Sequence, residues 1–152
     1  MRILPDSLLL PECIYRPGSF SGLMVLYESN YVKLIRLTGV LNPGESHWIS
    51  RVRQDHDLHL ERLRTEPYTS TLRMSYWLRD GASREFREPD FLIRIYLDAG
   101  QAEASAPQSP WRYPAIGTLL PRHSQELDRR WRRNMMLNKW LDYLLDRGHG
   151  FS

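Results

Sequence analysis

The chain has 152 residues, of which 41% are hydrophobic and 26% are charged, and this balance is typical of one soluble globular domain. Its formal net charge of +3 permits contact with an anionic partner but is too small to indicate nucleic-acid binding by itself. No apolar run approaches the roughly 18 residues that a membrane span needs, and the single cysteine, Cys13, excludes an intramolecular disulfide.

The first part of the chain predicts an irregular arm followed by a helix. Residues 1–18 contain several prolines, which interrupt any regular pattern. Ser19 or Ser21 can cap a helix that runs to about Leu37 and is stopped by Gly39. Its apolar residues recur at spacings of three and four and mark one buried face: Phe20, Met24, Tyr27, Tyr31, Leu34 and Leu37.

The middle of the chain predicts five strands, at residues 47–53, 57–65, 68–78, 91–97 and 101–106. Alternation is clearest in the third strand, where one side is expected to be buried: Tyr68, Leu72, Met74, Tyr76 and Leu78. The pattern slips near Glu61-Arg62, which indicates a β-bulge or a strand end. Residues 79–90 are expected to form a charged connection. Because no helix separates the strands, they predict an antiparallel meander.

The end of the chain predicts a linker and one long helix. Residues 107–121 carry four prolines, and residues 121–148 then show helical periodicity, with Ser124 as the expected cap and Gly148 beyond the last turn. One broad face is apolar: Leu127, Trp131, Met135, Leu137, Leu141, Leu144 and Leu145. Asn134 and Asn138 interrupt this face, and we expect both amides to hydrogen-bond to the sheet or to the first helix.

The opposite face of the last helix is the chain's most concentrated basic surface. Residues 111–152 have a charge balance of +4, whereas residues 1–110 have a balance of −1. The candidate binding residues on this face are Arg129, Arg132, Arg133, Lys139, Trp140 and Tyr143. Cations can bind phosphates while aromatic rings stack on bases. The competing interpretations are a solvated face whose arginine stems cover Trp140, or a deeper helix in which Trp140 is also buried.

Motifs for catalysis, metals and cofactors are missing from the sequence. There is no Gly-x-Ser-x-Gly elbow and no Walker or Rossmann glycine pattern. His56 and His59, with Asp57 between them, come nearest to a ligand cluster, but zinc requires three or four ligands. We therefore interpret them as a polar strand edge and predict neither a metal nor a cofactor.

Several short motifs occur in order along the chain: Met24 to Leu37, Tyr68-Thr69, Arg94-Ile95-Tyr96-Leu97-Asp98-Ala99, Tyr113-Pro114, and Asp128, Asn134, Trp140-Leu141, Tyr143, Leu145 and Gly148. The order and spacing of these motifs make the chain, from about Leu23 to Gly148, resemble the YqiB-like family, which is a bacterial family of unknown function. The resemblance implies a family fold and a bacterial cytoplasmic setting. It singles out six residues: Glu28, Asn30, Tyr31, Tyr96, Asp98 and Asn134.

Two positions depart from the family pattern. Leu97 stands where the family usually has His, and Asp128-Arg129-Arg130 stands where it usually has Asp-Glu-Lys. A catalytic role that required that His or Glu would therefore fail in this chain.

The sequence thus predicts a single α+β domain over residues 19–152, with an N-terminal helix, a five-stranded antiparallel meander and a long C-terminal helix packed on one face of the sheet. The leading functional hypothesis is a cytoplasmic, non-enzymatic binding or regulatory module that acts through a protein or anionic partner. One alternative is a small hydrolase or nucleotide-handling enzyme that uses carboxylates such as Glu28 and Asp98. Another is binding of a nucleic-acid backbone by the basic C-terminal helix.

Overall fold

A computed structural model describes residues 19–81, 84–105 and 122–151. The elements in these ranges are α2 (Phe20–Thr38), β1 (His47–Ser50), β2 (Leu58–Thr65), β3 (Thr69–Asp80), β4 (Arg84–Tyr96), β5 (Gln101–Ala104) and α3 (Arg122–Asp146). The predicted arm (1–18) and linker (107–121) lie outside the described residues. No helix within the described part is long and apolar enough to cross a membrane.

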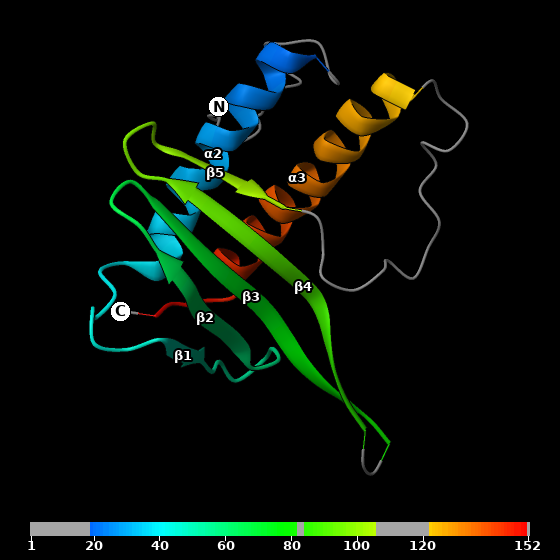
Figure 1. The fold of residues 1–152 in the computed structure, drawn as a ribbon. Coiled ribbons are helices and arrows are strands. Elements are labelled where there is room, and N and C mark those ends of the chain that lie inside the picture. The colour runs from blue at the N-terminus through cyan, green and yellow to red at the C-terminus, as the bar shows by residue number, and fades with distance from the viewer. Residues whose placement is uncertain (1–18, 82–83, 106–121, 152) are drawn as a thin grey trace, which may run out of the picture.

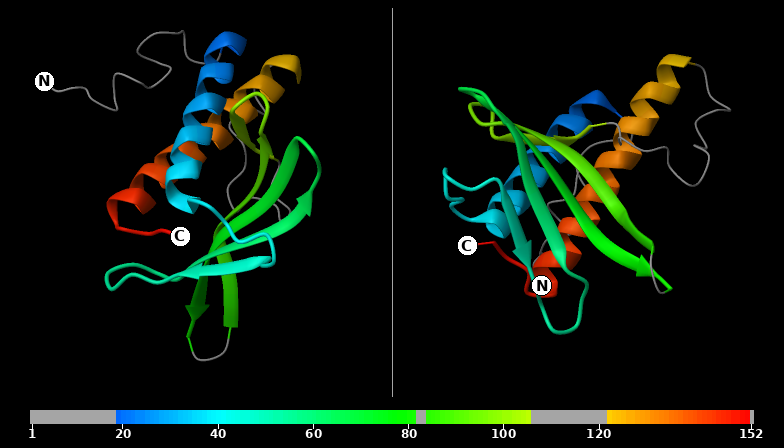
Figure 2. Two further views of the ribbon diagram at one scale, coloured as in Figure 1. Left: turned by 90° about the vertical axis from the view of Figure 1, so that its left-hand side faces the viewer. Right: turned by 60° about the horizontal axis from the view of Figure 1, so that its bottom comes forward.

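The strands form one antiparallel sheet in the order β1-β2-β3-β4-β5, which confirms the predicted meander. The two helices run side by side across one face of this sheet (Figure 1). Figure 2 shows in side view that neither of the described helices lies on the opposite face, which we call the helix-free face. The molecule therefore has two layers, and the inward-pointing strand residues are buried against the helices.

The core lies between the sheet and the helices. The strands contribute alternate residues with almost no exposed surface: Leu58, Leu60, Leu72, Met74, Phe91, Ile93, Ala102 and Ala104. The helices contribute Leu34 and Leu37 from α2 and Leu137, Leu141 and Leu144 from α3. A smaller cluster packs α2 against the first half of α3, where Trp131 contacts Leu23, Leu26 and Tyr27.

Local sequence signals set both ends of α2 and the C-terminal end of α3. The Ser19 hydroxyl accepts a hydrogen bond from the Gly22 N–H (3.0 Å), as an N-cap does, and the Gly39 N–H bonds to the Ile35 carbonyl at the other end. A Cβ at Gly22 would come within 2.8 Å of the Trp131 ring, so this close approach of α2 to α3 requires glycine. Gly148 has φ +90 and follows the end of α3, as predicted.

Asparagine side chains seal the β5 edge of the sheet. The Asn134 Oδ1 accepts from the Ala104 N–H (2.7 Å), and the Asn134 Nδ2 lies 3.5 Å from the Ala104 carbonyl. The Asn30 Nδ2 donates to the Ala102 carbonyl (3.3 Å). Side-chain amides thus take the place of a further strand along this edge, which confirms that Asn134 bonds to the sheet.

The same amides join the two helices. The Asn30 Nδ2 donates to the Asn134 Oδ1 (3.2 Å), and the Asn138 Nδ2 donates to the Asn30 Oδ1 (2.9 Å). The Lys33 Nζ then donates to the Asn138 Oδ1 (2.9 Å) and forms an ion pair with Asp142 (2.8 Å). All three asparagines are fully buried, so this network satisfies groups that would otherwise be costly to bury.

The charged segment 79–90, which we expected to be a connection, forms most of a long β3–β4 hairpin. β4 begins at Arg84 instead of residue 91, and β3 extends to Asp80. The prediction failed because this part of the hairpin is solvated, so it shows little hydrophobic alternation. Cross-strand charges support it instead, and Arg79 pairs with Glu85 across the hairpin (3.6 Å).

Smaller corrections concern element ends. β1 ends at Ser50 rather than at residue 53, and Tyr68, expected on the buried face, precedes β3 and is 67% exposed. α3 begins at Arg122, so Ser124 lies within the helix and is not its cap. The predicted slip in β2 is confirmed as a register shift between Arg62 and Arg64.

We predict that Asn134→Leu destabilises the fold by about 1–3 kcal/mol, because the Ala104 N–H and the Asn30 amide would lose their acceptor in a dry interior. Urea unfolding followed by circular dichroism measures this. Lys139→Ala, on the exposed side of the same helix, should change the free energy of unfolding by less than about 0.5 kcal/mol. Equal effects of the two substitutions would contradict the role given to Asn134.

Candidate functional site

The cations of the predicted basic surface on α3 are partly engaged within the chain. Arg132 forms an ion pair with Asp128 one turn earlier (2.9 Å). The Arg133 Nε donates to the Ala104 carbonyl (3.2 Å), and burial lowers the pKa of this guanidinium. Arg129 and Lys139 lie on the exposed side of the helix. The structure thus does not gather these four residues into one uniform surface.

Trp140 does not lie on the basic face, which corrects the prediction from the helical wheel. It is only 8% exposed and belongs to the main core, where its ring packs edge-on against Tyr76 (5.2 Å) and beside Phe91 (5.6 Å). Leu137, one turn before it, and Leu144, one turn after it, share its side of α3, so the helix lies deeper than its charges suggested. Tyr143 remains 42% exposed beneath the Arg147 guanidinium (5.0 Å).

The residues that the family resemblance singled out lie in different places. Asn30 and Asn134 belong to the buried amide network, and the Tyr96 hydroxyl donates to Glu103 (2.5 Å). Burial and Glu103 together raise the pKa of Tyr96. Tyr31 is partly buried against the main core.

The two carboxylates of the enzyme alternative, Glu28 and Asp98, are both exposed. Glu28 lies on α2 and Asp98 lies in the turn between β4 and β5. Neither carboxylate is therefore buried, and burial is one of the ways in which enzymes tune a catalytic acid or base.

A cluster that the sequence reasoning missed lies on the helix-free face of the sheet. Directly paired residues of antiparallel strands share a face. The register places His59, Ser75 and Asp90 in one row across β2, β3 and β4, and Trp77 beside Arg87 in the next. Strict alternation from Arg73 and Ser75 predicts that Trp77 follows them on this face, so the signal was present in β3.

The Trp77 indole is the centre of this cluster. The His59 imidazole stacks on it with ring centroids 4.0 Å apart and planes 7° from parallel, and the Arg87 guanidinium lies 4.6 Å from the indole centroid. The His47 Nε2 and the His59 Nδ1 are 3.0 Å apart. Glu61 completes the group through its ion pair with Arg87 (3.3 Å). We call His47, His59, Glu61, Trp77 and Arg87 the open-face cluster.

Its electrostatics favour a neutral His59. Burial lowers the pKa of this imidazole, and His47 and Arg87 lower it further, against opposing effects of the nearby carboxylates. The buried Trp77 Nε1 and Ser75 Oγ have no hydrogen-bond partner among the described residues. Such groups cost free energy in the isolated chain.

A second cluster links the chain's C-terminal end to the sheet. The Ser50 Oγ lies 2.8 Å from the His149 Nδ1, and the His149 Nε2 lies 2.9 Å from the Asp55 Oδ2. The Tyr76 hydroxyl also donates to that carboxylate oxygen (2.5 Å). Sequence reasoning could not find this series of hydrogen bonds, because His149 is 99 positions from Ser50 and 94 from Asp55.

This arrangement of serine, histidine and carboxylate has the composition of a hydrolytic triad, but its side chains are not accessible to a substrate. The His149 side chain is 0% exposed and the Asp55 side chain 5%. The Ser50 Oγ also accepts the Gly150 N–H (3.1 Å), so it is held by the chain itself. A nucleophile must reach its substrate. We therefore interpret these residues as a clasp that holds residues 149–150 against β1.

The open-face cluster and the clasp do not form metal sites. No group of three or more histidine, cysteine or carboxylate side chains converges within the described part of the chain. His56 is exposed and its ring lies edge-on to Tyr76 (5.4 Å), apart from the His47–His59 pair.

The clasp predicts a pH-dependent stability. Burial alone would raise the pKa of the Asp55 carboxyl, but hydrogen bonds from Tyr76, from the His56 main chain and from His149 hold that pKa below its usual value. Its contribution is therefore present above about pH 4 and is lost as the pH falls through the lower, folded-state pKa. Asp55→Asn should cost about 1–3 kcal/mol at pH 7, and its difference from the wild type should shrink between about pH 5 and pH 2.

Urea unfolding at several pH values measures this difference. Tyr76→Phe, which removes one donor to the carboxylate, should raise the pKa of Asp55 and reproduce part of the effect. A wild-type advantage that stays constant down to about pH 2 would contradict the assignment.

Comparison with known proteins identifies the family but supplies no activity. No curated protein and no solved structure matches the chain. The model of the family described as "Protein of unknown function (DUF1249)" matches residues 33–150, which include part of α2, the whole sheet, α3 and the clasp histidine. The chain therefore belongs to this family of proteins of unknown function.

Proposed function

We propose that this protein is a non-enzymatic binding module that contacts a protein partner through the helix-free face of its sheet. The observation that carries the proposal is Trp77, held on that face between strands by His59 stacking and by the Arg87 guanidinium. Tryptophan and arginine are the side chains most enriched among residues that dominate the energy of protein interfaces.

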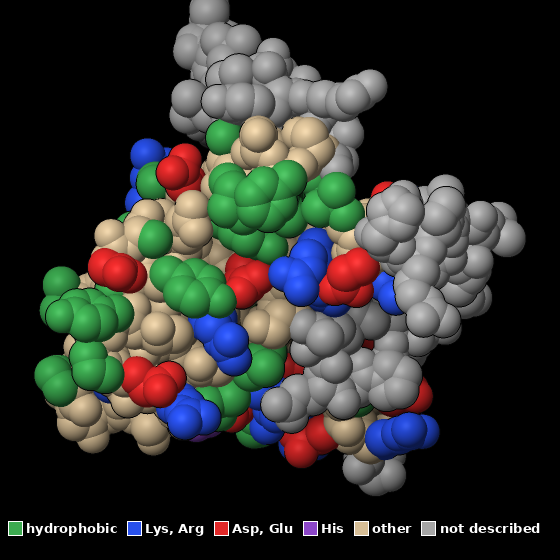
Figure 3. All heavy atoms as spheres, turned by 45° about the horizontal axis from the view of Figure 1, so that its top comes forward, with side chains coloured by type: hydrophobic (Ala, Val, Ile, Leu, Met, Phe, Trp, Pro, Cys, Tyr) green, Lys and Arg blue, Asp and Glu red, His purple; other side chains and the backbone are tan. Residues whose placement is uncertain are grey.

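The charges of the helix-free face support a protein partner over a nucleic acid. Its cations are matched by carboxylates: Arg73 binds Asp90 through two hydrogen bonds (2.9 and 2.6 Å), and Arg87 pairs with Glu61. On a different side of the molecule, viewed from the top side of Figure 1, the described basic and acidic side chains are interspersed as well (Figure 3). A nucleic-acid surface needs a surplus of cations, whereas mixed signs suit a folded protein with complementary charges of both signs.

The α3 helix offers less support for binding a phosphate backbone. Arg132 and Arg133 already contact groups of this chain, and Trp140 is buried where no base could stack on it. Of the two aromatic candidates on α3 only Tyr143 remains exposed, and the Arg147 guanidinium already lies over its ring, so little aromatic surface is left for stacking on bases.

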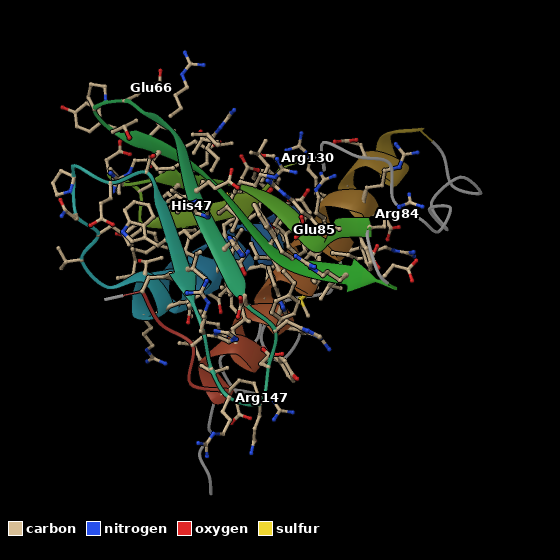
Figure 4. The ribbon with its side chains drawn as sticks, turned by 90° about the horizontal axis from the view of Figure 1, so that it is seen from below. His47, Glu66, Arg84, Glu85, Arg130 and Arg147 are labelled. Atoms are coloured by element: carbon tan, nitrogen blue, oxygen red, sulfur yellow. The ribbon has the colours of Figure 1, made fainter. Side chains whose placement is uncertain are left out.

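The side chains of the open-face cluster are held in place before any partner binds. His47 is exposed at the β1 end of the face, while Arg84 and Glu85 lie far away at the tip of the hairpin (Figure 4). Between them, Trp77 is fixed by its neighbours, so binding would cost little additional side-chain entropy. Because His47 is exposed at this end of the face, a partner carboxylate could bind its ring without any rearrangement of Trp77.

We predict that a photo-cross-linking amino acid at position 94, which is exposed on the helix-free face, captures a heterologous protein in cells. The same amino acid at position 139, exposed on α3, should not capture it. The captured protein is then identified by mass spectrometry and purified. Its affinity for the wild type should exceed its affinity for Trp77→Ala by about thirtyfold, the loss typical of a central interface residue.

One control and one further variant separate binding from folding. The control, Lys139→Ala, should bind the purified partner like the wild type. The further variant, Arg94→Glu, should weaken binding without disturbing the core. Unfolding midpoints of all variants show whether each remains folded. The proposal fails if position 94 gives no heterologous adduct, or if the purified partner binds Trp77→Ala and Arg94→Glu as tightly as the wild type.

A further inference from the structure

The two edge strands of the sheet differ in whether their outward-pointing main-chain groups are hydrogen-bonded. In an antiparallel pair, residues alternate between those whose main-chain groups bond to the neighbouring strand and those whose groups point away from it. The Ser105 N–H bonds to the Leu92 carbonyl, and continuing the register from this pair turns the main-chain groups of Ala102 and Ala104 away from β4. Asn30, Asn134 and Arg133 bind those groups. The β5 edge is thus closed.

The β1 edge is open. The Arg62 N–H bonds to the Ser46 carbonyl, so by the same alternation Trp48 and Ser50 bond to β2, while the main-chain groups of His47 and Ile49 point away from the sheet. No described residue forms a hydrogen bond with the main chain of His47 or Ile49. Such an edge is complementary to another extended chain.

The sequence around β1 is complementary to itself. Residues 45–51 read Glu-Ser-His-Trp-Ile-Ser-Arg, with Trp48 at the centre. In an antiparallel pairing about Trp48, each residue meets the one at the mirrored position. Ser46 then meets Ser50, His47 meets Ile49, and Glu45 meets Arg51. Both charged side chains are exposed, and they have opposite signs.

We propose that β1 pairs with β1 of a second copy of this chain, antiparallel and centred on Trp48. His47 and Ile49 of each copy then exchange main-chain hydrogen bonds with Ile49 and His47 of the other. The two-fold axis runs through the sheet at Trp48, so the interface is isologous. Glu45 and Arg51 flank β1 on either side, so Glu45 of each copy lies near Arg51 of the other and the opposite charges attract.

This dimer goes beyond the proposed partner binding and does not depend on it. Because paired strands share their faces, the two sheets become one continuous sheet, with the helices of both copies on one side. The helix-free faces then form one larger surface. Within each copy Arg51 also pairs with Asp57 (3.2 Å), so in the dimer the Arg51 guanidinium lies between two carboxylates.

The test is sedimentation equilibrium of the full chain over a wide range of concentration. The wild type should dimerise. Glu45→Arg and Arg51→Glu should each weaken dimerisation by about tenfold or more, because two attractive cross-strand pairs become two repulsive ones. An equimolar mixture of the two variants should associate like the wild type. In the mixed dimer the introduced arginine of one copy faces the introduced glutamate of the other, and the unchanged Arg51 and Glu45 face each other.

Ile49→Pro provides a second, independent variant. It removes an N–H that points away from β2, so it should abolish dimerisation while the circular-dichroism spectrum and the unfolding midpoint of the monomer stay close to those of the wild type. A wild type that stays monomeric at every concentration would overturn the proposal. So would a dimer that all three variants form as readily, or a mixture that fails to recover.

Discussion

The fold depends on the requirement that buried amide groups be fully hydrogen-bonded. Asn30, Asn134 and Asn138 are buried side by side between two helices and the last strand, and each one completes the hydrogen bonds of another. The same groups bind the outward main-chain groups of β5. One network therefore fixes how the helices lie against each other and where the sheet stops, and replacing any member leaves several polar groups unpaired in a dry interior.

This constraint makes the sheet asymmetric. One face is covered by helices and one edge by amides, so within the described residues one face and one edge of the sheet remain uncovered. The open face carries Trp77 with its stacked histidine and arginine, and the open edge carries the outward main-chain groups of His47 and Ile49. The clasp of Ser50, Asp55 and His149 uses chemistry found in hydrolases, but its burial assigns it to holding the chain end.

Patterns along the chain predicted most of the fold, and their failures have physical reasons. Helical spacing located both helices, and period-two alternation located the buried parts of the strands. The long β3–β4 hairpin was missed because cross-strand ion pairs such as Arg79–Glu85 support it where hydrophobic alternation fades. Trp140 was misplaced because the helical wheel assigned it to the face of the arginines, although Leu137 and Leu144 place the same side of α3 in the core.

The spacing and chemistry of neighbouring residues were sufficient to predict the class of fold, the antiparallel meander, both ends of α2, the C-terminal end of α3 and the need to hydrogen-bond Asn134 and Asn138. Which polar groups meet across the fold could be learned only from its three-dimensional packing. Asp55 meets His149 across 94 positions, and Asn30 meets Asn134 across 104. Such contacts depend on strand register and on the depth at which α3 packs, and these are set by the whole core acting together rather than by any local pattern.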